Sequence, residues 1–176
     1  MIATEIDLIV FRILHIAGGV AWVGSLFLFV VFVQPSVAAI APAGAPFMAE
    51  LLGRRKLVHW LLAFATTTIV AGAYLYWKLW DAAGGFGDWV GSSRGATLTV
   101  GGVAALAAFS IGLFITLPRV GRMLSLGRQV AESGGPPSPE VAAEIQRLQA
   151  TLKVAGRAAL GLLTLSVLAM AVARYW

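Results

Sequence analysis

The chain has 176 residues, of which 59% are apolar and 12% are charged, and it contains no cysteine. Because a water-soluble domain carries about 25% charged residues, this composition excludes an ordinary soluble protein and indicates a surface that faces lipid. The net charge of +5 comes from basic residues beside apolar runs, and this placement favours membrane topology over nucleic-acid binding. The lack of cysteine excludes disulfides, thiolate metal sites and c-type haem attachment.

Four apolar segments are long enough to cross a membrane. Residues 13–33, 57–77 and 95–118 carry no formal charge, and the fourth segment has Lys153 and Arg157 in its first turns, followed by a charge-free stretch at 158–173. A helix of about 20 residues crosses a ~30 Å hydrocarbon core. With their flanking residues, the predicted spans are approximately 8–34, 56–80, 95–118 and 152–175.

These segments are expected to form helices. A backbone in lipid must satisfy its own hydrogen bonds, and the runs are too long and too weakly alternating for the strands of a barrel. We therefore predict an all-α fold, with residues 1–176 forming one integral membrane domain built as a four-helix bundle.

The connection between the third and fourth spans is longer than a turn requires. Residues 133–139 are rich in glycine and proline, a composition that ends a helix. Ser138 is placed to cap a new helix, with Pro139 at its first position and Glu140 in its first turn. Since the third span is also expected to continue past Pro118, where a proline can kink the helix, the sequence predicts a helical hairpin that extends into the cytoplasm.

The distribution of basic residues predicts the orientation. More of them flank the first and third connections than flank the termini and the second connection. The positive-inside rule then places both termini outside and these two connections in the cytoplasm, with the chain in the cytoplasmic (inner) membrane. The basic residues of the predicted cytoplasmic side are Arg54, Arg55, Lys56, Arg119, Arg122, Arg128, Arg147 and Lys153.

The two histidines, His15 and His59, are candidate functional residues because both lie within predicted spans. An ionisable side chain inside a membrane is a functional candidate by default. A neutral histidine can instead hydrogen-bond a neighbouring helix and serve packing alone. Both interpretations stay open for each residue.

His15 shares a helical face with Gly18, Gly19 and Trp22. Two glycines would leave space beside the imidazole for a flat macrocycle, with the tryptophan as one wall. The alternative is that the glycines let another helix approach closely. The hypothesis that follows from the first interpretation is that His15 binds haem b in this space.

His59 lies near the start of the second span, and Lys153 and Arg157 enter the fourth span from the same side. These two cations would hold haem propionates or lipid headgroups. Counted at 1.5 Å per residue, His15 and His59 differ in depth by about 13 Å. This difference favours two separate sites over one metal bound by both residues.

Met170 is predicted at a depth close to that of His15, and histidine with methionine is a known axial pair of haem. Methionine at such a position is more often a core residue. Arg12 and Arg174 are the cations available for propionates on that side. The sequence holds no three-histidine set for zinc or copper and no Ser/His/Asp constellation, so we do not expect a hydrolase.

The stretch from Leu14 to Gly24, LHIAGGVAWVG, resembles the first-helix signature of the copper resistance protein D family and is similar to that of HemJ-type protoporphyrinogen oxidases. In HemJ-type proteins the first-helix histidine precedes a tryptophan by seven residues, as His15 precedes Trp22. The resemblance implies haem binding at His15, or metal handling if the chain is a copper-family member. HemJ-type proteins pair that histidine with a lysine in the third span, and residues 95–118 contain none, so oxidase activity is not implied. That span instead presents small residues suited to close packing: Gly101, Ala105, Ala108 and Gly112.

We therefore expect an integral membrane protein that binds haem b through His15, with His59 as a second candidate ligand, and that transfers electrons or holds haem in a membrane redox system. Whether it is an enzyme, such as a membrane oxidoreductase, stays open. Copper transport or handling is one alternative, and a structural subunit of a membrane complex is another. The expected partners are the lipid bilayer and either a second copy or a redox complex, and not nucleic acid.

Overall fold

The computed structural model describes residues 2–41 and 43–175. Over these residues the chain is helical and contains no strand, in agreement with the predicted all-α fold. Four helical stretches within the described ranges are long and apolar enough to cross a membrane, and they correspond to the four predicted spans. These stretches are Glu5–Ala39, Leu57–Ala82, Ser93–Ser133 and Pro139–Tyr175.

The described residues form α-helices joined by short π-helical segments. In chain order the helices are α1 (Ile2–Leu28), α2 (Gln34–Ala39), α3 (Ala45–Ala49), α4 (Leu57–Ala82), α5 (Phe86–Gly91), α6 (Ser93–Ser110), α7 (Leu117–Ser133) and α8 (Pro139–Val172). The π-helical segments are Phe29–Val33, Glu50–Arg54 and Ile111–Thr116, and α8 ends in a 3₁₀ turn, Ala173–Tyr175.

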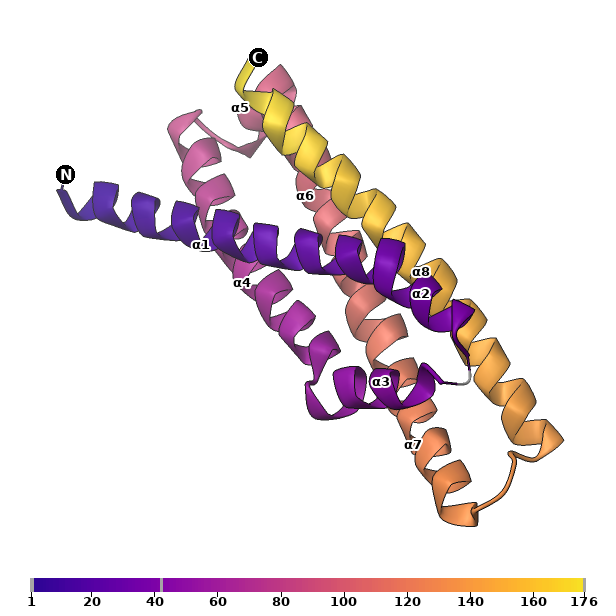
Figure 1. Ribbon diagram of the computed structural model, residues 1–176. Coiled ribbons are helices and arrows are strands. Elements are labelled where there is room, and N and C mark those ends of the chain that lie inside the picture. The colour runs from indigo at the N-terminus through magenta and orange to yellow at the C-terminus, as the bar shows by residue number, and fades with distance from the viewer. Residues whose placement is uncertain (1, 42, 176) are drawn as a thin grey trace.

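The first helix crosses the others at an angle, whereas α4, α6 and α8 run side by side and α7 continues α6 (Figure 1). Helix α1 packs mainly against α4, and α6 packs mainly against α8. The bundle is therefore built from two helix pairs. These pairs meet in a core of mostly small residues around one large ring: Trp22, Ala65, Ala105, Ala108, Ala159 and Leu163.

Small side chains bring α6 and α8 together. A Cβ at Gly101 would lie 3.1 Å from the Cβ of Ala169 and 3.3 Å from the carbonyl oxygen of Ser166. Ala105 and Ala108 are buried on the same face. Because helices in lipid associate through close van der Waals packing, this contact explains why the third span carries small residues, and the predicted packing face is confirmed.

Two of the spans contain a proline, and a π-helical segment precedes each proline. Pro35 follows Phe29–Val33, and Pro118 follows Ile111–Thr116. A proline within a helix has no N–H to donate and crowds the carbonyl four residues earlier. The wider π turn accommodates this crowding, so the helix continues through Pro118 as α7.

Helices α7 and α8 form a hairpin at the end of the bundle away from both termini (Figure 1). Gly134, with a φ of 67°, ends α7 in the left-handed conformation that glycine favours. The Oγ of Ser138 accepts a hydrogen bond from the backbone N–H of Val141 at 3.4 Å. The predicted cap and the helix start at Pro139 are confirmed.

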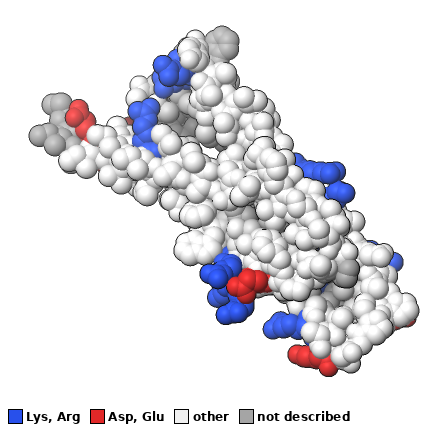
Figure 2. Space-filling view, in the orientation of Figure 1, with Lys and Arg blue, Asp and Glu red and all other residues white. Residues whose placement is uncertain are grey.

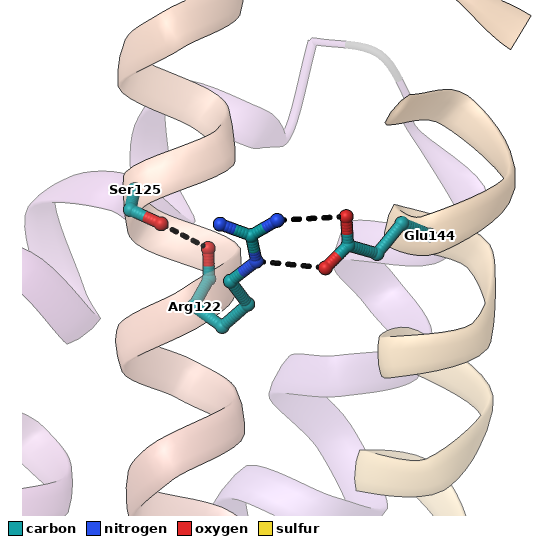
Figure 3. Close-up of polar contacts among 3 residues, drawn as sticks. All are labelled: Arg122, Ser125 and Glu144. Atoms are coloured by element: carbon teal, nitrogen blue, oxygen red, sulfur yellow. Dashed lines mark hydrogen bonds and ion pairs between the residues drawn. The ribbon is translucent and has the colours of Figure 1, made fainter. Parts of the chain in front are cut away.

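An ion pair closes this hairpin on its exposed side. The guanidinium of Arg122 in α7 donates two hydrogen bonds, at 2.7 and 2.9 Å, to the carboxylate of Glu144 in α8 (Figure 3). Helix α8 alone has 34 residues. At 1.5 Å per residue it is about 51 Å long, against a ~30 Å hydrocarbon core. Helix α8 is therefore longer than a span of the hydrocarbon requires.

The surface of the bundle is mostly uncharged, with charged side chains gathered mainly toward its ends (Figure 2). Large apolar side chains are exposed along the helices, among them Val20 (69%), Val103 (60%) and Phe114 (70%). A soluble protein rarely exposes so much contiguous apolar surface. The surface is consistent with association of these helices with a lipid bilayer.

Candidate functional site

His15 lies on α1 where this helix crosses α4. Its Nδ1 is 2.8 Å from the carbonyl oxygen of Thr68. Because a carbonyl only accepts hydrogen bonds, Nδ1 carries a proton and donates it, and in the neutral imidazole Nε2 has a free lone pair. The ring of His15 is half-buried, whereas Thr68 is 8% exposed. The contact fixes both the orientation and the tautomer of the imidazole.

Two glycines, one on each helix, make this close crossing possible. A Cβ at Gly72 of α4 would lie 2.8 Å from both Cε1 and Nδ1 of His15. A Cβ at Gly18 of α1 would lie 2.6 Å from Oγ1 of Thr68 and 3.2 Å from the carbonyl oxygen of Phe64. A methyl group at either position would therefore displace the ring or push the two helices apart.

The space that the sequence suggested beside His15 is occupied by α4. Residues of α4 occupy the space beside Gly18, and a Cβ at Gly19 would lie 3.7 Å from Cγ2 of Thr68. Trp22, expected as a wall of this space, is 6% exposed and belongs to the central core. Among the described residues the two glycines thus admit a helix, as the packing alternative expects, and the side of α1 that carries Gly18 and Gly19 has no clearing for a macrocycle.

The second ring nitrogen of His15 is the reactive feature of the site. In the described part of the chain, only Nδ1 of this ring has a hydrogen-bond partner. An unpaired polar nitrogen inside a hydrocarbon core would be costly, because no water is present there to bind it. A histidine that binds a metal commonly has this arrangement, with one nitrogen held by a carbonyl and the other free. At this crossing Nε2 is therefore the ring nitrogen of His15 that has no partner among the described residues.

His59 does not come near His15. It is exposed in the first turn of α4 and precedes Thr68 by nine residues, which is about 13 Å along the helix. Two imidazoles on one metal bring their nitrogens within roughly 4 Å, at about 2 Å per bond. One chain therefore cannot bind one metal through both histidines.

The structure places Met170 and His15 against different helices. Met170 packs against a glycine of α6, whereas His15 packs against α4. Arg12 is exposed on α1, one turn before His15. Arg174, at the end of α8, lies over the ring of Tyr175, 5.2 Å from its centroid. Of the cations proposed for propionates on this side, Arg12 is the one that shares a helix with His15.

Lys153 and Arg157 are exposed on α8 at the end of the bundle that holds His59. Their neighbour Leu152 packs in the same hydrophobic cluster as Val58, the neighbour of His59. Neither cation has a carboxylate within 4.0 Å among the described residues. The two positions suit anionic headgroups as well as propionates.

A polar cluster on α1 and α4 was missed by sequence reasoning. Tyr74 donates its hydroxyl hydrogen to Oδ2 of Asp7 and stacks on Phe11 with a centroid distance of 4.1 Å. The Nζ of Lys78 lies 5.7 Å from the centroid of the Tyr74 ring and 5.0 Å from that of Trp77. The aromatic residues signal a membrane interface, but only the crossing of α1 over α4 shows that Asp7 meets Tyr74.

The residues at His15 fit a metal held through one imidazole and do not fit a haem held between two histidines of one chain. No group of three His, Cys, Asp or Glu residues that could hold a metal gathers within the described ranges, so at this crossing the described residues offer a single imidazole. Comparison of the chain with protein-family models, with curated proteins and with solved structures finds no match.

Proposed function

We propose that this protein is an integral membrane haem protein that binds haem b through His15 and transfers electrons within the membrane or holds haem for a larger redox complex. The observation that supports this proposal is the hydrogen bond from Nδ1 of His15 to the carbonyl of Thr68, with Nε2 left unbonded. Haem b would supply one-electron chemistry at its iron.

The residues of the chain would present and hold the ligand nitrogen. The carbonyl of Thr68 keeps the proton on Nδ1 and increases the basicity of Nε2. The backbone at Gly72 lies against the Nδ1 and Cε1 edge of the ring, so the imidazole cannot tilt toward α4. A ligand imidazole that is held by packing and by a hydrogen bond at its other ring nitrogen keeps its orientation. A site that changes only its oxidation state requires such a fixed geometry.

A structural role at the α1–α4 crossing is the second candidate. Gly18, Gly72 and His15 interlock the two helices, and such a contact stabilises a helix pair without any cofactor. The two functions differ in what loss of the imidazole removes. A haem protein loses its pigment, whereas a structural subunit loses only stability.

The test is the haem content of protein purified from haem-replete cells. We expect a Soret band and haem b in a pyridine haemochrome assay of the wild type. His15→Gln is expected to lose the pigment while retaining its far-UV circular dichroism. His59→Gln, on α4 but about 13 Å from Thr68 along the helix, is the matched control and is expected to keep it.

Three outcomes would overturn the haem proposal. A wild type without porphyrin that is destabilised by His15→Gln would support the structural role. Stoichiometric copper without porphyrin would support copper handling. Pigment that survives His15→Gln would place haem elsewhere in the protein.

The orientation is also proposed: the chain lies in the cytoplasmic membrane with both termini outside and the α7–α8 hairpin in the cytoplasm, as the distribution of basic residues favours. Because the chain has no cysteine, single cysteines report sidedness directly. Gly135→Cys in the hairpin turn is expected to react with an impermeant maleimide only after the membrane is opened. Gly84→Cys, between α4 and α5, is expected to react in intact cells, and the reverse pattern would invert the topology.

A further inference from the structure

An open groove lies between α1 and α4 beside their crossing. Phe11 and Leu14 line it from α1, and alanines, threonines and Val70 line it from α4. The hydroxyls of Thr66 and Thr67 already donate to backbone carbonyls of their own helix. The groove therefore offers no free donor from its walls and suits a hydrocarbon chain.

One end of this groove is polar and charged. Asp7 shares a helical face with Phe11 and Leu14. On α4, Tyr74 and Lys78 continue the face that carries Val70. The hydrogen bond from the Tyr74 hydroxyl to Asp7 closes this end, and the ammonium of Lys78 lies over the Tyr74 ring. An apolar trough thus ends at a carboxylate and an ammonium group.

We propose that this groove binds one molecule of phosphatidylethanolamine. An acyl chain lies between α1 and α4, the phosphate contacts Lys78, and the ethanolamine ammonium contacts Asp7. The proposal does not depend on haem binding at His15.

The charges at the polar end select this headgroup. Lys78 has no carboxylate within 4.0 Å among the described residues, so its ammonium is available to a phosphate. The carboxylate of Asp7 accepts one hydrogen bond at each oxygen, from the Leu8 N–H and from Tyr74, and it retains further lone pairs. A primary ammonium can donate to those lone pairs, a choline group cannot, and an anionic headgroup would be repelled by Asp7.

The length of the groove matches one lipid leaflet. The groove is lined on α4 from Ala63 to Ala71, a length of about 12 Å at 1.5 Å per residue. Half of a ~30 Å hydrocarbon core is about 15 Å. An acyl chain of one leaflet is therefore long enough to follow the groove.

The experiment measures lipid retained by the full chain after purification in mild detergent, from cells whose membranes contain both phosphatidylethanolamine and phosphatidylglycerol. Native mass spectrometry of the wild type is expected to show one bound phosphatidylethanolamine. Lys78→Gln is expected to weaken the affinity for this lipid by about tenfold or more, the effect of losing one charge-assisted hydrogen bond, and so to lower its occupancy. Val70→Trp fills the groove from a position that is 58% exposed and is expected to abolish retention.

Matched variants control for general effects on the chain. Arg94→Gln removes another exposed cation, and Val103→Trp adds a ring at a position that is 60% exposed on α6. Both are expected to retain the lipid, and circular dichroism checks that all four variants are folded. Equal retention in all variants, preferential retention of phosphatidylglycerol, or a quinone in place of the phospholipid would overturn the proposal.

Discussion

Replacing Gly72 by alanine tests the packing at the α1–α4 crossing. The new Cβ would lie 2.8 Å from both Cε1 and Nδ1 of His15, which is too short for any van der Waals contact. The imidazole must then move away from α4 and lose its hydrogen bond to Thr68. A substitution on the far side of the bundle would have neither effect.

The expected magnitude follows from three contributions. Overpacking of a tight contact costs about 1–3 kcal/mol, and loss of the hydrogen bond costs about 1 kcal/mol. The higher helix propensity of alanine returns about 1 kcal/mol. We therefore expect Gly72→Ala to lower the free energy of unfolding by about 1–3 kcal/mol.

A double-mutant cycle with His15→Ala isolates this contact. With the imidazole removed, the new methyl group meets no ring, so Gly72→Ala is expected to be neutral or stabilising in that background. The coupling between the two positions is expected to be about 2 kcal/mol, within the range for residues in contact. Unfolding in detergent micelles can be followed through the fluorescence of the six tryptophans. Equal effects of Gly72→Ala in both backgrounds would refute the close approach of His15 to α4.

Three further outcomes are expected. Gly18→Ala places a Cβ 2.6 Å from Oγ1 of Thr68 and should destabilise the protein by about 1–3 kcal/mol. A Cβ at Gly24, on the same helix, meets nothing within 4 Å, so Gly24→Ala should not destabilise the protein. Equal unfolding midpoints for the two variants would contradict this prediction. Gly95→Ala directs a Cβ onto the carbonyl oxygen of Trp89, so limited proteolysis between α5 and α6 should become faster. An unchanged cleavage pattern would count against this close contact between Gly95 and Trp89. The hydrogen bonds from Arg122 hold the pKa of Glu144 below its usual 4.5. The pair therefore stabilises the hairpin above pH 4.5, and this effect is lost as the pH falls through the lowered pKa. Thermal unfolding measured across pH should show that Glu144→Gln reduces stability at neutral pH and makes no difference in strong acid.

The four spans could be predicted because length and charge decide them. A run such as 95–118, without a formal charge, has no stable place in water. The cap at Ser138 and the small-residue face at Gly101 were also readable, since each depends on residues close together in the sequence. These features required no knowledge of which helix meets which.

The partners of His15 could not be predicted for the same reason. Thr68 and Gly72 lie more than fifty residues away in sequence, and their contact with His15 depends on the crossing of α1 over α4. The sequence allowed Gly18 either to clear a space or to admit a helix, and only the position of α4 decides between the two. Asp7 and Tyr74 meet through the same crossing.

The form of the helix at Pro118 was likewise beyond local reasoning. Proline crowds the preceding turn, and this crowding can be relieved by a kink or by a wider turn. The structure has the wider turn, the π-helical segment Ile111–Thr116. A second segment of this kind precedes Pro35, where no change in the helix was expected from the sequence.

Electron paramagnetic resonance of the ferric protein, with its histidines labelled with ¹⁵N, examines the proposed bond between His15 and haem iron itself. We expect a haem signal coupled to one imidazole nitrogen, with the coupling absent in His15→Gln and present in His59→Gln. A haem signal whose nitrogen coupling is unchanged in His15→Gln, or a purified wild type with no haem signal at all, would contradict haem binding at His15.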